Sequence, residues 1–301
     1  MKVAVLKGGR GLERQVSLRS GARVEDALAA LGHEVLAIDA GGDLVATLRR
    51  ERPEVAFVAL HGAGGEDGTV QELLEILAIP YTGPGAAACM RSIDKVLAKH
   101  ALREAEVPTP DWFAFNINAF RELGAAETMD EIEASLGFPL VIKPARGGSS
   151  LGVRFAAGHA DVPQALVAAL SYDDRVVLER HIEGREIAVS MINGIALPAV
   201  EVRPREEDRF NYEARYEIGR TTYECPADLG AAEGPVLDAA LRSWDALGLE
   251  GFARVDLILG EGGPQVLEAN AIPGLTDTSL LPMAAEAAGD AGDHAVATRA
   301  Q

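Results

Sequence analysis

The first third of the chain alternates short apolar runs with apolar positions at helical spacing. The apolar runs predict strands at residues 2–6, 34–38 and 55–60, and the helical spacing predicts helices at residues 16–31, 44–50 and 69–77. Strands and helices in alternation are typical of a parallel sheet with helices on its faces. A cluster of prolines and glycines at residues 80–85 marks the edge of this region.

The remainder of the chain changes from mixed helices and strands to a series of strands. Helices are predicted at residues 94–105 and 161–170, with strands at residues 138–143, 153–155 and 176–180. Strands then dominate, at residues 186–192, 195–202, 221–225, 252–259 and 265–269, around one helix at residues 236–247. Residues 203–220 form a long polar segment without periodicity, and loops of that length are usually functional or disordered. We predict an α/β fold that becomes α+β in its C-terminal half, with domains at residues 1–88, 89–182 and 183–301.

Composition and charge narrow the classes of partner. Among 301 residues, 28 Lys and Arg stand against 46 Asp and Glu, a net charge of −18, which disfavours nucleic acid or an anionic membrane as the main partner. Any anion must therefore be held by locally placed groups, and only five residues are lysines (Lys2, Lys7, Lys95, Lys99 and Lys143). Two cysteines without disulfide spacing, and no membrane-spanning or signal-peptide pattern, lead us to expect a soluble cytoplasmic protein.

Two late strands predict a hairpin that carries paired acids. If the turn of residues 260–264 centres on Gly262, Asp256 lies opposite Glu268 and Arg254 lies opposite Asn270, all on one face. Opposed carboxylates destabilise a sheet unless a cation lies between them, and oxygen ligands suit Mg²⁺. The alternative is a solvated polar face, but the apolar neighbours of both acids make bare carboxylates costly and favour the metal site.

A glycine- and serine-rich loop follows the strand predicted at residues 138–143. Gly147, Gly148, Ser149 and Ser150 offer backbone and hydroxyl donors to phosphate oxygens, with Lys143 at the strand end. The spacing excludes a P-loop, and a loop of this kind is by itself more often a mobile turn. The scarcity of lysine favours the phosphate interpretation, with Lys95 as a second candidate.

Two further glycine-rich turns, at residues 8–14 and 61–69, follow strands and precede helices. A helix N-terminus suits anion binding, and the C-terminal ends of parallel strands form a binding crevice. Neither turn has the GxGxxG spacing, so a Rossmann dehydrogenase is disfavoured. Each turn on its own has the simpler explanation of a tight connection between strand and helix.

Several motifs occur in a fixed order: GGRGLERQVSLRSG (8–21), LHGAGGEDGTVQ (60–71), YTGPG (81–85), SIDK (92–95), PLVIKPARGGSSLG (139–152), EGREI (183–187), FNYEARY (210–216), RVD (254–256) and LEANAIPGLTDTSLLP (267–282). This set closely resembles the D-alanine–D-alanine ligases of the ATP-grasp superfamily, over residues 2–289. The resemblance implies an ATP-grasp fold with an N-terminal Rossmann-like domain, ATP between the central and C-terminal domains, and a homodimer formed through the N-terminal domain.

The resemblance also implies which residues would bind ATP and metal. Lys95 and Lys143 would contact phosphates below the loop that contains Gly148 and Ser149, and Glu179 with the following segment would form the adenine hinge, with Glu186 near the ribose. The implied ligands of two Mg²⁺ or Mn²⁺ ions are Asp256, Glu268 and Asn270, the residues that strand pairing selects independently.

The implied reaction joins two D-alanines into a peptidoglycan precursor through an acylphosphate. Glu13 would hold the amino group of the first D-alanine, with Ser150 and Tyr216 as hydrogen-bonded companions that close a lid. Arg254 and Gly274 would stabilise the tetrahedral intermediate, and Ser279 and Leu280 would receive the carboxylate of the second D-alanine. His61 would contact substrate or shape its turn.

The chain departs from the family pattern at a few places, which keep alternatives open. Gly11 stands where Ser is common, Arg215 where Lys is usual, Glu72 where Gly is usual and Ala271 where Thr is usual, and the tail after Gly289 lacks an amphipathic helix. Tyr216 favours D-alanine as the acceptor. The alternatives are a ligase of this fold for D-lactate, D-serine or an L-amino acid, and a nucleotide-binding homologue without turnover.

Overall fold

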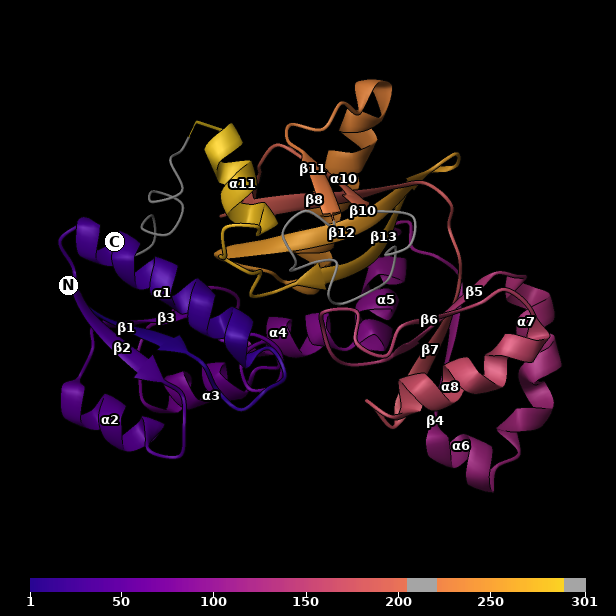
Figure 1. Cartoon of the computed structure of the whole chain (residues 1–301), viewed down its shortest axis with the longest axis horizontal. Coiled ribbons are helices and arrows are strands. Elements are labelled where there is room, and N and C mark those ends of the chain that lie inside the picture. The colour runs from indigo at the N-terminus through magenta and orange to yellow at the C-terminus, as the bar shows by residue number, and fades with distance from the viewer. Residues whose placement is uncertain (205–220, 290–301) are drawn as a thin grey trace.

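A computed structural model describes residues 1–204 and 221–289, and its first layer is a parallel sheet. The strand order is β2-β1-β3, with the first strand in the middle, and the strands are β1 (Lys2–Lys7), β2 (Glu34–Asp39) and β3 (Val55–Val58). The accompanying helices are α1 (Arg14–Ala30), α2 (Leu44–Glu51) and α3 (Thr69–Ile76). The predicted alternation is confirmed, and it places the turns at residues 8–13 and 59–68 at the C-terminal ends of β1 and β3 (Figure 1).

The second layer is an antiparallel sheet with helices beside it. Its order is β4-β7-β5-β6, from β4 (Trp112–Asn116), β5 (Leu140–Pro144), β6 (Arg154–Ala156) and β7 (Arg175–Arg180). The helices of this layer are α6 (Ile117–Glu122), α7 (Met129–Leu136) and α8 (Val162–Leu170). The sequence did not predict β4, α6 or α7. The residues of β4 are mostly half-buried on both faces, so they lack the alternation that identifies a strand.

The third layer is a larger antiparallel sheet. Its order is β11-β10-β8-β12-β13, from β8 (Arg185–Ile192), β10 (Val200–Pro204), β11 (Thr221–Glu224), β12 (Phe252–Gly260) and β13 (Gly263–Asn270), and β9 (Ile195–Ala196) pairs with β8. Two helices belong to this part, α10 (Glu233–Leu247) and α11 (Leu280–Ala287). The prediction of α/β followed by α+β is confirmed. The single strand predicted at residues 195–202 is wrong, because β9 and β10 are separate and β10 continues to Pro204.

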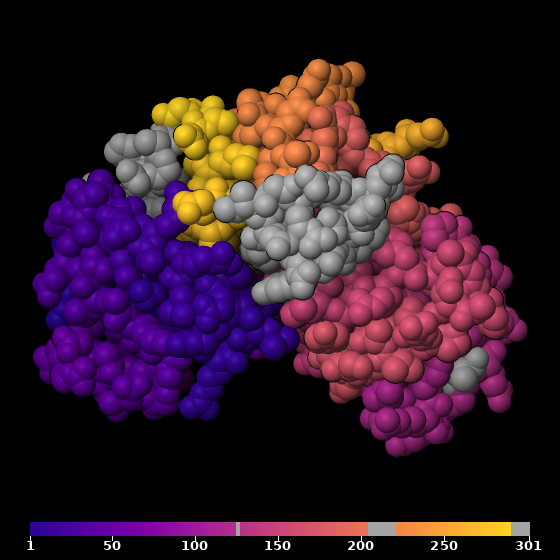
Figure 2. Space-filling view, in the orientation of Figure 1, coloured from indigo at the N-terminus to yellow at the C-terminus, as the bar shows by residue number. Residues whose placement is uncertain are grey.

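The buried apolar residues form two main cores. One core is shared by the N-terminal and C-terminal parts, where Phe57 of β3 stacks on Phe252 of β12 with ring centroids 5.9 Å apart. The central part, β4 to β7, has its own core around Leu140, Ile142 and Leu178. Figure 2 shows the N-terminal and C-terminal parts in contact and the central part to one side.

Two helices link these parts. Helices α4 (Ala86–Ile93) and α5 (Lys95–Glu104) follow the parallel sheet, and both pack against α10 and β13 of the third layer. The domain boundaries remain a prediction, and this packing favours a central unit that begins after α5. In the described parts of the chain, no helix combines the length and the apolar character needed to cross a membrane.

Candidate active site

The β12–β13 hairpin has the predicted pairing at its site end. Arg254 lies opposite Asn270, and Asp256 lies opposite Glu268. Between this pair and the turn a bulge shifts the register, so that Leu257 pairs with Val266 and the predicted centre at Gly262 does not hold near the turn. A bulge redirects side chains. Here the extra residue is Leu267, and Leu267 and Glu268 both line one cavity.

The opposed acids are held by cationic and amide groups. The Arg254 guanidinium contacts both oxygens of Asp256, at 2.7 and 2.8 Å, and Asn270 Nδ2 donates to Asp256 Oδ2 at 3.0 Å. Lys95 Nζ lies 3.4 Å from Glu268 Oε2. Asp256 is buried, so a freely solvated face does not describe this hairpin. An all-oxygen set of two carboxylates and an amide fits a hard divalent cation, and the three predicted ligands lie together.

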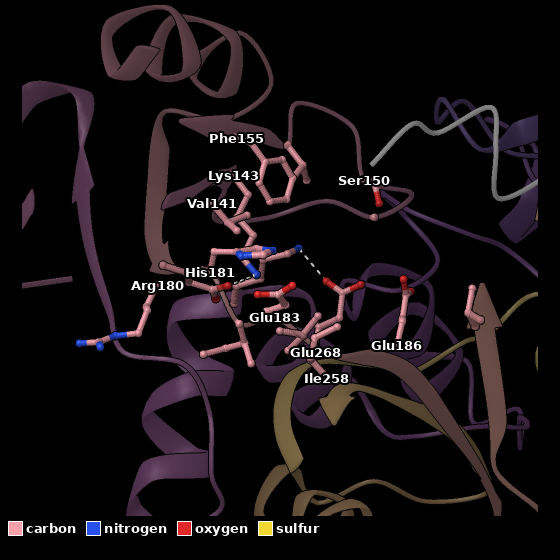
Figure 3. Close-up of a pocket in the computed structure, with 18 of the residues that line it drawn as sticks. Val141, Lys143, Ser150, Phe155, Arg180, His181, Glu183, Glu186, Ile258 and Glu268 are labelled. Carbon is pink, nitrogen blue, oxygen red and sulfur yellow. Dashed lines mark ion pairs between the residues drawn. The ribbon is translucent and has the colours of Figure 1, made fainter. Parts of the chain in front are cut away.

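A cavity of about 320 Å³ lies between the central sheet and the third sheet. It brings together most of the residues predicted to bind ATP, Lys95, Lys143, Gly148, Glu179 and Glu186, with the predicted metal ligand Glu268. Figure 3 shows Val141, Lys143 and Phe155 on one side of the cavity and Ile258 with Glu268 on the other. Apolar walls near one group of charges suit a ligand with a flat apolar part and an anionic part.

Lysines approach this cavity from two elements. Asp94 caps α5 by accepting from the backbone N–H groups of Val96 and Leu97, which fixes Lys95 in the first turn. The Lys95 ammonium also donates to Gly147 O at 2.7 Å and so holds the glycine-rich loop. Lys143 lies at the end of β5, and its Nζ is 2.7 Å from Glu179 Oε2.

Glu179 is turned inward on lysines. Its other oxygen, Oε1, lies 2.8 Å from Lys99 Nζ, and all three side chains are buried. Burial alone raises the pKa of the Glu179 carboxyl, but Lys143 and Lys99 outweigh this and bring that pKa below its ordinary value. The segment after Glu179, which the family pattern assigns to the adenine hinge, also lines the cavity, at residues 180–184. Sequence reasoning missed Lys99, although it lies one helical turn after Lys95 in a chain poor in lysine.

The glycine-rich loop between β5 and β6 has an unusual backbone. Ser149 and Ser150 have φ angles of 56° and 57°, a left-handed conformation that costs roughly 1–3 kcal/mol for a residue with a side chain. A Cβ atom on Gly148 would lie 3.5 Å from Glu13 Oε1, so the loop approaches the N-terminal turn closely. Strain of this kind is concentrated at binding and catalytic sites.

A smaller cavity of about 30 Å³ adjoins the first and is lined from all three parts. Glu13, His61 and Glu66 come from the N-terminal part, Gly148 and Ser149 from the loop, and Arg254, Glu268, Asn270 and Gly274 from the C-terminal part. Burial raises the pKa of the Glu13 carboxyl, and the negative charge of Glu66 raises it further. Gly62 has a φ angle of 69°, which favours glycine, and a Cβ there would lie 2.3 Å from Glu13 Oε2 and so displace this carboxylate. The sequence reasoning did not single out Glu66, although it belongs to the motif at residues 60–71.

His61 belongs to a chain of hydrogen bonds that fixes the loop after β13. Leu275 N–H donates to Ser20 Oγ at 3.1 Å, Ser20 Oγ lies 2.8 Å from His61 Nε2, and His61 Nδ1 lies 3.1 Å from Ile272 O. This order is satisfied when Nδ1 is the protonated nitrogen and Ser20 donates to Nε2. The chain joins α1 to residues 272–275 and so holds Gly274 against the small cavity.

The remaining predicted substrate residues lie just beyond. Ser279 precedes α11 and accepts from Thr276 N–H at 2.9 Å, and Leu280 begins the helix. Gly274 lies so close that a Cβ there would be 2.8 Å from Ser279 Oγ. Ser279 and Leu280 line neither cavity described above. Tyr216, Arg215 and the tail after Gly289 lie outside the described residues, so the predicted contact of Ser150 with Tyr216 stays a prediction.

Comparison with known proteins gives a consistent result. Family models described as D-ala D-ala ligase N-terminus and C-terminus match residues 43–84 and 101–297. A D-alanine–D-alanine ligase of Synechococcus sp. (strain JA-3-3Ab) is 42% identical over 294 residues, covering 96% of this chain and 89% of that protein. A D-alanine–D-alanine ligase B of Pseudomonas putida is 41% identical over 292 residues, covering 96% of this chain and 88% of that protein.

Solved structures agree with these relatives. A crystal structure of D-alanine–D-alanine ligase from Bacillus anthracis matches with a TM-score of 0.86 at 35% identity, covering 99% of this chain and 96% of that chain. The complex of the Bacillus anthracis enzyme with ATP matches with a TM-score of 0.83 at 32% identity, with the same coverage. A D-Ala:D-Ser ligase from Enterococcus faecalis matches with a TM-score of 0.82 at 26% identity, covering 98% of this chain and 97% of that chain.

Proposed function

The chain belongs to the D-alanine–D-alanine ligase family, and on that premise we propose how its residues divide the work of joining two D-alanines with ATP. The activity of the family is the ATP-dependent formation of D-alanyl-D-alanine for cell-wall synthesis. The observation that supports our assignment best is the 320 Å³ cavity in which the buried lysines Lys95 and Lys143 lie with Glu268, one of the two paired acids of the β12–β13 hairpin. Side chains from the central and C-terminal parts meet there, as an ATP site between those parts requires.

ATP fits this cavity with its base toward the apolar walls and its phosphates toward the lysines. Val141, Phe155, Ile258 and Leu267 offer surfaces for the adenine ring, and Glu186 lies in the same cavity for the ribose. Lys95 and Lys143 offer ammonium groups to the phosphates, and the loop at Gly148, which lines the same cavity, and Ser149, which lines the smaller one, offers backbone donors. In a protein with a net charge of −18, such local cations are needed to hold a polyphosphate.

We assign Asp256, Glu268 and Asn270 as the residues that would hold Mg²⁺ or Mn²⁺. The support is the chemistry of the donors and their placement on one face of the hairpin. When bound, the metal neutralises charge on the terminal phosphates of the nucleotide. Arg254 and Lys95 contact the two carboxylates and place positive charge beside them.

The small cavity suits the first D-alanine. Glu13 would hold the ammonium group of this substrate, with Ser150 and Tyr216 as its predicted companions. One carboxylate oxygen of the substrate would face the γ-phosphorus of ATP beside Glu268 and Lys95. The raised pKa of Glu13 supports the role, because burial and Glu66 raise it more than His61 and Ser149 lower it, and a substrate ammonium would supply further positive charge beside this carboxyl.

The reaction then requires two displacements. The carboxylate oxygen of the first D-alanine bonds to the γ-phosphorus while the bond to the β–γ bridging oxygen breaks, which yields D-alanyl phosphate and ADP. The amine of the second D-alanine attacks the acyl carbon, loses a proton and expels inorganic phosphate. Arg254 and the backbone N–H of Gly274 would stabilise negative charge on the acyl oxygen, and Ser279 and Leu280 at the start of α11 would receive the second carboxylate.

Phosphate release tests this assignment. The protein is incubated with ATP, Mg²⁺ and D-alanine, and in parallel with L-alanine, D-serine or D-lactate beside a low fixed concentration of D-alanine. We expect added D-alanine to raise phosphate release and to yield D-alanyl-D-alanine. We expect the other acceptors to leave release at the level that the low fixed concentration of D-alanine gives. Preferred use of another acceptor would favour a ligase that joins D-alanine to that acceptor. The similarity to a D-Ala:D-Ser ligase supports testing this alternative. ATP binding without release would favour a homologue that does not turn over.

Two further proposals follow from family membership. We propose a homodimer formed through the N-terminal part, and light scattering during size-exclusion chromatography would return the monomer mass if this is wrong. We also propose a cytoplasmic location, since the reaction consumes ATP, and cell fractionation tests it.

A further inference from the structure

We propose that Lys99 and Thr109, neither of which lines the nucleotide cavity, are positioning residues for ATP. Lys99 leaves the Lys143–Glu179 pair with a surplus positive charge, and Thr109 fixes that group relative to β13. The inference rests on the ATP site proposed above, and it adds two residues outside the cavity and the sequence motifs.

Lys99 changes the net charge of the group around Glu179. Glu179 lies between two lysines, 2.7 Å from Lys143 Nζ and 2.8 Å from Lys99 Nζ, and the three side chains are 2%, 7% and 0% exposed. With Lys143 alone, the pair would be neutral, and the carboxylate would cancel most of the field that Lys143 directs at a phosphate. Because Lys99 neutralises Glu179 from the inner side, the three groups together have one net positive charge. Only Lys143 and Glu179 of the three line the cavity, so that charge is presented to the nucleotide.

Lys99 also fixes the position of the group around Glu179 relative to β13. Lys99 Nζ also donates to Thr109 Oγ1 at 2.7 Å and lies 3.3 Å from Pro110 O. Thr109 Oγ1 donates onward to Val266 O at 2.8 Å, and Val266 N–H donates to Pro108 O at 2.8 Å. The segment at residues 108–110 therefore binds both the backbone N–H and the backbone C=O of Val266 at the outer edge of β13.

This pairing connects the two walls of the cavity. Val266 is two residues before Glu268, the predicted metal ligand, and it lies beside the bulge that brings Leu267 and Glu268 into the cavity. Lys99 thus forms an ion pair with Glu179 of the central sheet on one side and is hydrogen-bonded, through Thr109, to β13 of the third sheet on the other. The two sheets belong to different cores, so a short bridge of this kind fixes the distance between Lys143 and the hairpin acids.

The surplus charge on these three groups predicts that ATP affinity depends on pH. Burial lowers the pKa of the Lys99 ammonium to about 8, although Glu179 opposes this, and Lys143 and Arg103 add to the lowering. These three are the charged groups that face Lys99 from β7, β5 and its own helix. As pH rises through that value Lys99 loses its proton, the surplus charge disappears, and ATP binding weakens. Below that value the charge is fully present.

The test compares substitutions that keep or remove single groups. Thr109→Val keeps the shape of the side chain and removes the hydroxyl, whereas Thr109→Ser keeps the hydroxyl. Lys99→Met keeps the length and removes the charge. For each variant, equilibrium titration with ATP and Mg²⁺ in the absence of D-alanine gives Kd, steady-state phosphate release gives the KM values for ATP and D-alanine, and thermal unfolding gives Tm.

We expect Lys99→Met to weaken ATP binding at least about tenfold, roughly what loss of one charged hydrogen bond gives. We expect Thr109→Val to weaken it several-fold and Thr109→Ser to bind as the parent does, with the KM for D-alanine unchanged in all three. The KM for ATP of the parent should rise between pH 7 and 9, and that of Lys99→Met should not. If Lys99→Met does not fold, the pair of Thr109 variants decides.

The failures are distinguishable. Variants that bind ATP as tightly as the parent, or lose affinity for ATP and D-alanine equally in step with Tm, overturn the positioning roles and leave the proposed function intact. A parent protein that binds no ATP overturns the proposed function, and this inference with it.

Discussion

The central part and the combined N- and C-terminal body differ in how their cores are built. The body buries one continuous core across its two sheets, with Phe57 stacked on Phe252, whereas the central part buries its own around Leu140 and Leu178. The larger cavity lies on the boundary between these cores, and most walls of the small cavity belong to the shared body. The width of the nucleotide site therefore depends on the contacts that join the two cores, namely the Lys99–Thr109 bridge and the small cluster of Val96, Ala145 and Val177. The walls of the substrate site that carry Glu13 and Gly274 belong instead to the body with one continuous core.

The largest effects are expected when each core is damaged separately, which tests whether the two cores unfold independently. Leu140→Ala empties the central core and Leu247→Ala the shared one, and each removes a fully buried side chain at a cost of about 2–5 kcal/mol of unfolding free energy. Trp112 lies on the central sheet and Trp244 in the shared core, so each part has its own fluorescent reporter.

We expect urea unfolding of Leu140→Ala to shift the Trp112 transition and leave the Trp244 transition near that of the parent, with the reverse for Leu247→Ala. The measurement uses Trp112→Phe and Trp244→Phe backgrounds, so that each contains one reporter. Transitions that move together in both variants would mean that the two cores unfold as one.

A second experiment tests the role of Glu268, on the side of the nucleotide cavity formed by the β12–β13 hairpin. Glu268→Gln removes one carboxylate from the predicted metal set and leaves the fold, and we expect turnover to fall at least about a hundredfold. Glu261→Gln is the matched control, because it makes the same change at the exposed turn of the same hairpin. Phosphate release measures both, and near-normal turnover of Glu268→Gln would remove this acid from the site.

Glu13→Gln should move activity and stability in opposite directions. Loss of the charge-assisted contact to the substrate ammonium should raise the KM for D-alanine about tenfold or more. The folded-state pKa of Glu13 is raised above its ordinary 4.5 by burial and by Glu66, so the native protein holds this proton more tightly and loses stability as pH rises through that range.

At pH 7 the Gln variant is therefore expected to unfold at a higher temperature than the parent, and the difference should vanish below about pH 4.5. Thermal unfolding across pH tests this, with Asp26→Asn on the exposed side of the same helix as the control. A Gln variant less stable than the parent at pH 7 would show that Glu13 is ionised and well paired in the empty site.

The smallest effect is expected at Gly11, where the family commonly has Ser. A Cβ there would lie 3.7 Å from Glu13 Oε2 and 3.6 Å from Ala63 O, which is ordinary contact distance, so Gly11→Ser fits. We expect a change in unfolding free energy within about 0.5 kcal/mol and a KM for D-alanine that is equal to or lower than that of the parent. A large rise in KM would indicate that the glycine is required in this chain.

The sequence predicted best what short-range periodicity determines. The parallel layer follows from alternating strand and helix patterns, and the pairing of Asp256 with Glu268 follows from a side-chain period of two around a glycine-rich turn. The bulge beside Asp256 was not predictable, because either strand could accept the extra residue without changing the apolar pattern.

What escaped prediction depends on contacts between distant segments. Lys99 meets Glu179, and Thr109 meets Val266, across 80 and 157 residues of sequence, and no local pattern indicates either contact. The inward turn of Glu179 is equally invisible, because a charged residue in a strand is expected to face solvent. Only the number of lysines, five in 301 residues, hinted that each would have a specific partner.

The pairing of residues 108–110 with β13 also affects the tendency of the protein to aggregate at high concentration. β13 is the last strand of its sheet, and an open outer strand is a template on which other chains add and aggregate. The segment occupies both backbone groups of Val266, and its prolines Pro108 and Pro110 have no N–H with which to extend a ladder. We therefore expect the segment at residues 108–110 to hinder the addition of another chain to this edge of the sheet.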